Sequence, residues 1–147
     1  MLRFVLLCAA ILNAAVCLGG DLYRDAAERA TMSAKYATCE AQSLPVLTPL
    51  PDYEYFRCLA LSAAEDATNL AETATADADA ADSWWKKYSY QQVLRATNQQ
   101  WNPAKLTEAK QQYDAWVAKS LDHSKRAEEA CGLSRNAAMS ARLYLAD

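Results

Sequence analysis

Small apolar residues recur at alternating spacings of four and three positions along most of the chain. This heptad spacing puts them on one face of an α-helix, where they form a narrow seam that packs against a neighbouring helix. A first helix is predicted over about residues 22–43. Its seam consists of Tyr23, Ala27, Ala30, Ala34, Ala37, Ala41 and Leu44.

Two longer helices with the same pattern are predicted downstream, at about residues 53–99 and 103–131. The seam of the second helix consists of Ala60, Ala64, Ala67, Ala71, Ala74, Ala78, Ala81, Trp85 and Tyr88. The seam of the third consists of Leu106, Ala109, Tyr113, Trp116, Ser120, His123, Ala127 and Ala130. Because most of these side chains are methyl groups, we expect the helix axes to approach to about 8 Å. An Ala-rich chain also produces this spacing by chance, and burial of the seams distinguishes the two cases.

Helix boundaries are indicated by proline, asparagine and glycine. Three closely spaced prolines end the first helix, and Asp52 is expected to cap the second. Asn102 followed by Pro103 is a start signal for the third helix, because the Asn side chain accepts hydrogen bonds from the first free amides. Gly132 is expected to end that helix, which leaves a short C-terminal helix at about residues 134–146. The prediction is therefore an all-α fold, an elongated antiparallel three-helix bundle with a short fourth helix.

Cysteine positions predict how the first two helices are aligned. We expect a disulfide between Cys39 and Cys58, which pairs residues of the two helices whose numbers add up to about 97. Ala37 then faces Ala60, so the alignment set by the disulfide also places the two Ala seams opposite each other. In an oxidising compartment such a disulfide stabilises the fold by about 3 kcal/mol. Opposing residue numbers in the second and third helices are expected to add up to about 201.

Beyond the predicted signal peptide the chain has a third cysteine, Cys131, which has no predicted partner within the chain. The alignment puts it beside Leu70, about 18 Å along the bundle from Cys58, which is too far for a disulfide. Two states are open for it: a free thiol buried in the core, or a disulfide that links two copies of the chain. Of these, we expect the linked homodimer.

Residues 1–19 have the features of a secretory signal peptide. Arg3 is followed by fifteen residues, Phe4 to Leu18, that are apolar except for Asn13. This length is typical of a signal peptide and is shorter than the ~20 residues of a membrane-spanning helix. We expect cleavage after Gly19, with an uncleaved anchor as the alternative. Residues 20–147 then form a single domain that is secreted to the extracellular space.

The formal net charge is −3, and acidic residues occur without any basic residue between Arg57 and Lys86. Nucleic acids and anionic membranes bind proteins through clustered Lys and Arg, so neither is expected as a partner of the mature chain. The acidic stretch is interpreted as a solvated helix face rather than a calcium loop, because it contains no Gly.

No residue pattern indicates catalysis, a metal centre or a cofactor. His123 is the only histidine, and its position in the seam indicates a partly buried structural residue. The chain contains no HExxH, CxxC or nucleophile-elbow motif. The protein is therefore not expected to be an enzyme, and no catalytic or metal-binding residue is assigned.

Aromatic residues concentrate in the middle of the chain and form two stripes on the predicted helices. One stripe consists of Tyr90, Val93, Leu94, Thr97 and Trp101. The other, on nearly the opposite side, consists of Trp84, Trp85 and Tyr88. One stripe must pack against the third helix, and the other is either sealed by a neighbouring segment or exposed for a partner. The candidate binding patch consists of Trp84, Trp85, Tyr88, Trp101 and Trp116.

These observations predict a binding or structural protein. We expect a secreted, non-enzymatic helical protein that binds an unidentified protein partner, self-associates through Cys131, or serves as an extracellular structural component. The alternative is a carrier that holds a small apolar ligand between the second and third helices, with the five residues of the candidate patch lining its pocket. A carrier is expected to copurify with its ligand.

Overall fold

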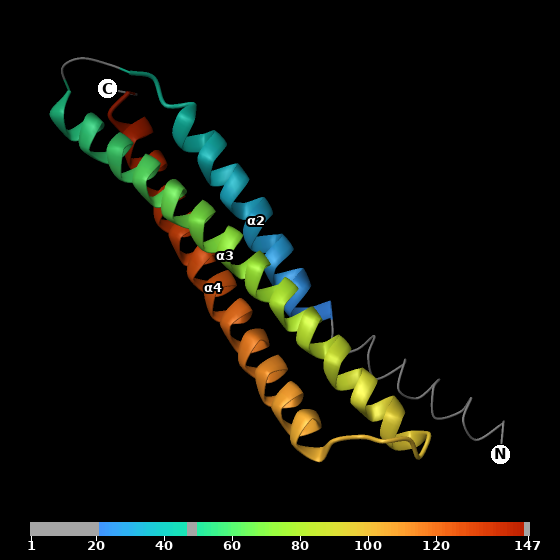
Figure 1. Ribbon diagram of the computed structural model, residues 1–147. Coiled ribbons are helices and arrows are strands. Elements are labelled where there is room, and N and C mark those ends of the chain that lie inside the picture. Colours follow the sequence, from blue (N-terminus) through green and yellow to red (C-terminus); the bar gives the residue numbers. More distant parts are fainter. Residues whose placement is uncertain (1–20, 47–49, 146–147) are drawn as a thin grey trace.

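The computed structural model describes residues 21–46 and 50–145, whose helices run side by side (Figure 1). These helices are α2 at Asp21–Gln42, α3 at Pro51–Ala96 and α4 at Pro103–Leu143. α3 is antiparallel to both α2 and α4, and each helix contacts the other two. The prediction of an all-α, elongated antiparallel three-helix bundle is confirmed. The predicted signal peptide, residues 1–19, lies outside the described residues.

The Ala seams form the core of the bundle. All seven positions of the first predicted seam are buried, and so are the seven Ala positions of the second seam, from Ala60 to Ala81. Such complete burial is the result expected of a packing seam rather than of chance spacing in an Ala-rich chain. Tyr53 is the largest fully buried side chain, followed by two serines. The core is therefore thin.

Serine hydroxyl groups show how closely α3 and α4 approach each other. Ser120 Oγ donates a hydrogen bond to the carbonyl oxygen of Ala74 at 2.9 Å, and Ser134 Oγ donates to that of Ala60 at 2.8 Å. A side chain as short as serine reaches the backbone of a facing helix only when the two axes lie close together. In both pairs the two residue numbers add up to 194, whereas a sum of about 201 was predicted for opposing residues of these two helices.

The alignment of α2 with α3 differs from the prediction. Tyr23 donates a hydrogen bond to Asp82, and the hydroxyl oxygens of Thr38 and Thr68 are 3.4 Å apart. Opposing residue numbers therefore add up to about 105 instead of 97. The difference is about one heptad, and a shift of one heptad still places Ala opposite Ala. The two Ala seams fit both alignments, so they could not distinguish the correct one.

The structure does not contain the predicted disulfide between Cys39 and Cys58. Both residues are free thiols at exposed positions. In the observed alignment Cys39 lies opposite about residue 66 of α3, which is about eight residues, or about 12 Å, from Cys58 along the helix. A disulfide requires Cα atoms about 4.4–6.8 Å apart. The cysteine pairing that set the predicted alignment is therefore not compatible with the fold.

The start of α4 agrees with the prediction, whereas both ends of α3 differ from it. Asn102 caps α4 as predicted, and its side-chain oxygen accepts hydrogen bonds from two amides of the first turn. α3 begins at Pro51, with Leu50 as its cap and no side-chain hydrogen bond to the free amides. Asp52 therefore lies inside the first turn instead of capping it. α3 ends at Ala96, a few residues before the predicted end at about residue 99.

Gly132 does not end α4, and the predicted fourth helix at residues 134–146 is the continuation of α4 to Leu143. Glycine inside a helix costs about 1 kcal/mol relative to alanine. Continuing the helix buries four further side chains against the bundle, namely Ser134, Ala137, Ala138 and Ala141. This burial offsets the cost of the glycine, so the helix runs through it.

Candidate functional site

The hairpin formed by α3 and α4 extends beyond the start of α2. Tyr23, near the start of α2, donates a hydrogen bond to Asp82 of α3. Because α3 continues from there to Ala96, its last turns lie beyond the start of α2. We call residues 83–112 the hairpin tip, which is the yellow and orange end of the bundle in Figure 1. In the tip the α3 seam changes from Ala to Trp85 and Tyr88. These larger side chains cover the α3–α4 interface where α2 does not reach.

Trp85 is packed against α4, and Tyr88 is packed against Trp85. The ring centroid of Trp85 lies 5.0 Å from that of Tyr113 and 5.4 Å from that of Tyr88. Tyr113 also makes an edge contact with Tyr23, with 6.3 Å between centroids. These distances are typical of favourable aromatic pairs. The stripe that contains Trp85 and Tyr88 is therefore the half-buried one, and it joins the tip to the start of α2.

The other predicted stripe faces solvent. The side chains of Tyr90, Val93 and Trp101 are 62%, 53% and 36% exposed. The guanidinium carbon of Arg95 lies 5.2 Å from the centroid of the Trp101 ring, close enough for a cation–π interaction. The tip thus presents apolar and aromatic surface next to a positive charge.

The five residues of the candidate patch have different surroundings. Trp85 and Tyr88 are half-buried in the stripe described above, and Trp101 is exposed in the loop. Trp84 and Trp116 are half-buried, and each ring is covered by a lysine. Lys87 Nζ is 3.7 Å from the Trp84 centroid, and Lys119 Nζ is 4.1 Å from the Trp116 centroid. Of these residues, Trp84 also lines the small pocket described below, and an apolar-ligand pocket lined by all five stays a prediction.

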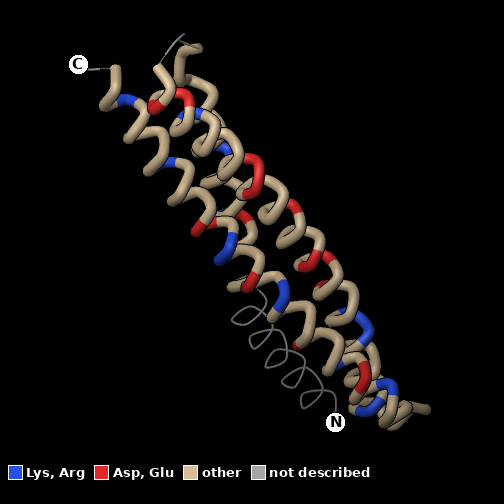
Figure 2. Tube along the Cα trace, turned by 90° about the vertical axis from the view of Figure 1, so that its left-hand side faces the viewer, with Lys and Arg blue, Asp and Glu red and all other residues tan. Residues whose placement is uncertain are grey.

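The hairpin tip is basic, whereas the rest of the described chain is acidic. The tip has five basic residues and one acidic residue, Glu108, for a net charge of +4; the basic residues are Lys86, Lys87, Arg95, Lys105 and Lys110. The remaining described residues have nine basic and sixteen acidic side chains, for a net charge of −7. Figure 2 shows basic positions close together at the tip end of the bundle. The net charge of the whole chain conceals this separation.

A cluster of charged and polar residues fixes the start of α2 at the boundary of the tip. Arg24 forms ion pairs with Asp79, at 3.0 Å, and with Asp82, which also accepts the hydrogen bond from Tyr23. Burial raises the pKa of Tyr23, and the bond to Asp82 raises it further. Burial alone would raise the pKa of Asp82, but hydrogen bonds from Tyr23 and Arg24 hold it below its ordinary value. The cluster therefore favours an ionised Asp82 and the observed alignment.

A small pocket lies between α3 and α4 within the tip. It has a volume of about 230 Å³ and is lined by Trp84, Lys87, Tyr90, Gln91, Lys105, Glu108 and Ala109. Gln91 Oε1 accepts a hydrogen bond from the backbone amide of Asn102 at 3.1 Å, which ties the loop to the pocket wall. The sequence singled out Trp84 but placed Tyr90 on nearly the opposite side, and it gave no signal for the α4 residues. Their proximity to α3 depends on the alignment of the hairpin.

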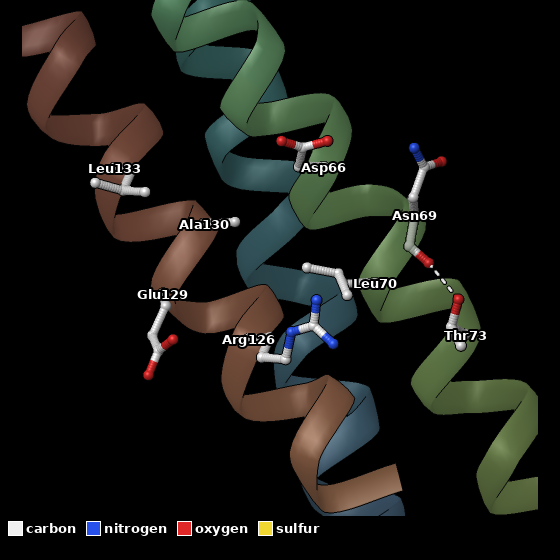
Figure 3. Close-up of a pocket in the computed structure, with 8 residues that line it drawn as sticks. All are labelled: Asp66, Asn69, Leu70, Thr73, Arg126, Glu129, Ala130 and Leu133. Atoms are coloured by element: carbon white, nitrogen blue, oxygen red, sulfur yellow. Dashed lines mark hydrogen bonds between the residues drawn. The ribbon is translucent and has the colours of Figure 1, made fainter. Parts of the chain in front are cut away.

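A more open groove of about 520 Å³ lies between α3 and α4 nearer the middle of the bundle (Figure 3). It is lined by Asp66, Asn69, Leu70, Thr73, Arg126, Glu129, Ala130 and Leu133. The guanidinium group of Arg126 projects from α4 towards Leu70. The same guanidinium group lies 3.9 Å from Asp122. The groove therefore combines a small apolar floor with side chains of both charges, and it does not single out one class of ligand.

His123 links α4 to α3. Its Nδ1 atom lies 2.7 Å from Oδ2 of Asp77, whose side chain is nearly buried. Within residues 21–46 and 50–145, no group of three or more His, Cys, Asp or Glu side chains is arranged to hold a metal ion.

Cys131 is a buried free thiol with 3% of its surface exposed. Burial raises the pKa of this thiol, which disfavours the reactive thiolate. Within the single chain the thiol is therefore buried, as in the first of the two states considered for it, and the Cys131-linked homodimer stays a prediction.

The fold and the site define an elongated three-helix bundle with a basic, aromatic tip. No protein-family model matches the chain, and comparisons with curated proteins and with solved structures find no match. None of the helices described here is both long enough and apolar enough to span a membrane. The function is therefore inferred from the residues of this chain alone.

Proposed function

We propose that this chain is a secreted, non-enzymatic binding protein that contacts an acidic partner protein through the hairpin tip. The observation that carries the proposal is the combination of exposed aromatic and apolar side chains with a net charge of +4 at one end of the bundle. Exposed apolar residues that are bordered by polar groups are typical of protein interfaces, in which aromatic residues and Arg are enriched. Secretion is inferred from the sequence of residues 1–19.

The charge separation along the bundle supports an acidic partner. The tip attracts such a partner, while the rest of the bundle, with its net charge of −7, repels it. Together these fields orient the two proteins before contact, which raises the association rate and excludes wrong orientations. A second copy of the chain also offers an acidic surface, so self-association through the tip is the second candidate.

Affinity capture of the tagged, secreted protein tests the proposal. The tip variant Tyr90→Ser/Val93→Ser removes exposed apolar surface, and the control variant Tyr55→Ser/Leu59→Ser does the same at the opposite end of α3. We expect the wild type and the control to retain a shared set of acidic proteins that the tip variant loses. Retention should fall at about 0.5 M salt, because screening weakens exposed charge pairs.

Two results would contradict the proposal. One is retention of the same proteins by the tip variant, and the other is their loss from the control variant. Sedimentation of the purified chain separates self-association from binding of a different protein. N-terminal sequencing of secreted material tests the export step, since the mature chain should begin near Gly20.

A further inference from the structure

The pocket in the hairpin tip contains basic side chains that lack acidic partners. Lys87 and Lys105 both line it, and neither forms an ion pair within the described part of the chain. Lys110, the next lysine along α4, is by contrast paired with Asp114 at 2.8 Å. Two lysines from different helices, neither with an acidic partner among the described residues, therefore line one small cavity, and the Lys87 ammonium lies over the Trp84 ring in its wall. An anion is the complementary ligand.

The position of Lys105 strengthens this preference for an anion. It lies in the first turn of α4, and that turn contains no acidic residue. The N-terminal end of a helix carries a partial positive charge that stabilises nearby anions. The pocket thus lies beside two lysine side chains and the positive end of a 41-residue helix.

The other lining residues limit the ligand further. Trp84 and Tyr90 supply aromatic surface, and Ala109, which is nearly buried, adds an apolar contact. Glu108 is the only acidic residue of the pocket, and a carboxylate can only accept hydrogen bonds. A matching ligand has an anionic group for the lysines, an aromatic ring, and a hydrogen-bond donor for Glu108.

We propose that this pocket binds a small aromatic carboxylate with a hydroxyl group on its ring. The carboxylate pairs with Lys87 and Lys105, the ring packs against the aromatic side chains, and the hydroxyl donates to Glu108. The volume of about 230 Å³ is below the range of about 300–1,000 Å³ found for drug-sized ligands, which indicates a single ring with a short acidic side chain. This site lies in the same tip as the proposed protein interface and shares Tyr90 with it, but its test uses a small ligand and no partner protein. It differs from the apolar-ligand pocket predicted from the sequence.

Calorimetric titration of the folded protein with 4-hydroxyphenylacetate tests the site. We expect a Kd below about 1 mM. The neutral analogue 4-hydroxyphenylacetamide should bind at least about tenfold more weakly, because it cannot pair with the lysines. Phenylacetate, which lacks the hydroxyl group, should also bind more weakly than the hydroxylated acid.

Lysine variants connect the binding to this pocket. Lys87→Gln and Lys105→Gln should each weaken binding of 4-hydroxyphenylacetate about tenfold, with the helical circular dichroism unchanged. The matched control is Lys119→Gln, since Lys119 also covers a Trp ring but lies outside the pocket. Equal binding of the acid and its amide, an equal loss in the Lys119 variant, or no binding at about 1 mM ligand would overturn the proposal.

Discussion

Replacing Ala67 with leucine tests whether the Ala seam sets the distance between the helices. Ala67 has no exposed surface and belongs to the central core cluster, to which all three helices contribute. An isobutyl group in place of the methyl group forces the helices apart or the side chain out of its preferred rotamers. Overpacking of this kind destabilises a protein by about 1–3 kcal/mol. For a domain of this size, that loss corresponds to a fall in Tm of about 3–12 °C.

Equilibrium unfolding in urea, followed by circular dichroism, measures this effect directly. The matched control is Ala76→Leu, which makes the same change at an exposed position of α3. Alanine and leucine have similar helix propensities, so the control should stay within about 0.5 kcal/mol of the wild type. A denaturant midpoint that is unchanged or raised in Ala67→Leu would refute the packing argument.

Other substitutions test individual contacts. Gly132→Ala should raise stability by about 0.5–1 kcal/mol, because the added methyl group meets nothing within 4 Å and glycine is a poor helix former; a loss of stability would contradict the helical assignment there. His123→Ala leaves the nearly buried Asp77 carboxylate without its partner and should cost about 1.5–3 kcal/mol, whereas an unchanged urea midpoint would argue against the pair. Asp82 has a lowered pKa in the folded state, so its stabilisation is present above its ordinary pKa of 3.8 and is lost as the pH falls below that value. Asp82→Asn should therefore flatten the acid limb of the stability curve, and identical limbs for variant and wild type would exclude this role. Alkylation of the native protein followed by mass spectrometry should label the two exposed cysteines but not Cys131 until the chain unfolds; native labelling of Cys131 would contradict its burial.

The core was predictable from the sequence, but the alignment of α2 with α3 was not. Heptad spacing identifies which side chains are buried, since it depends only on the geometry of one helix. Alignment depends on differences between successive heptads, and the Ala seams have almost none. Ala37 meets an Ala whether it faces Ala60 or Ala67. The observed alignment is fixed by single polar contacts near the two ends of α2, between Tyr23 and Asp82 and from the Tyr53 hydroxyl to the carbonyl oxygen of Pro45, at 2.5 Å.

The candidate site was only partly predictable for a related reason. The concentration of aromatic residues is visible in the sequence, but its division into packed and exposed stripes depends on how α3 packs against α4. The basic character of the tip was missed because a net charge averages over the chain, whereas a partner meets only one end. Lys87 and Lys105 are on different helices, and only the turn between those helices brings them to one pocket.

The repetitive core has a consequence for the length of the molecule. Because the seams repeat every seven residues and their buried side chains in the middle of the bundle are Ala, Ser or Cys, adding or removing one heptad at the same level in all three helices leaves small side chains facing one another. Each such step changes the bundle by about 10 Å and alters no residue of the tip. Insertion or deletion of heptads can therefore change, in steps of one heptad, the distance between the hairpin tip and the opposite end of the bundle. Selection can act on this distance while the residues of the hairpin tip stay the same.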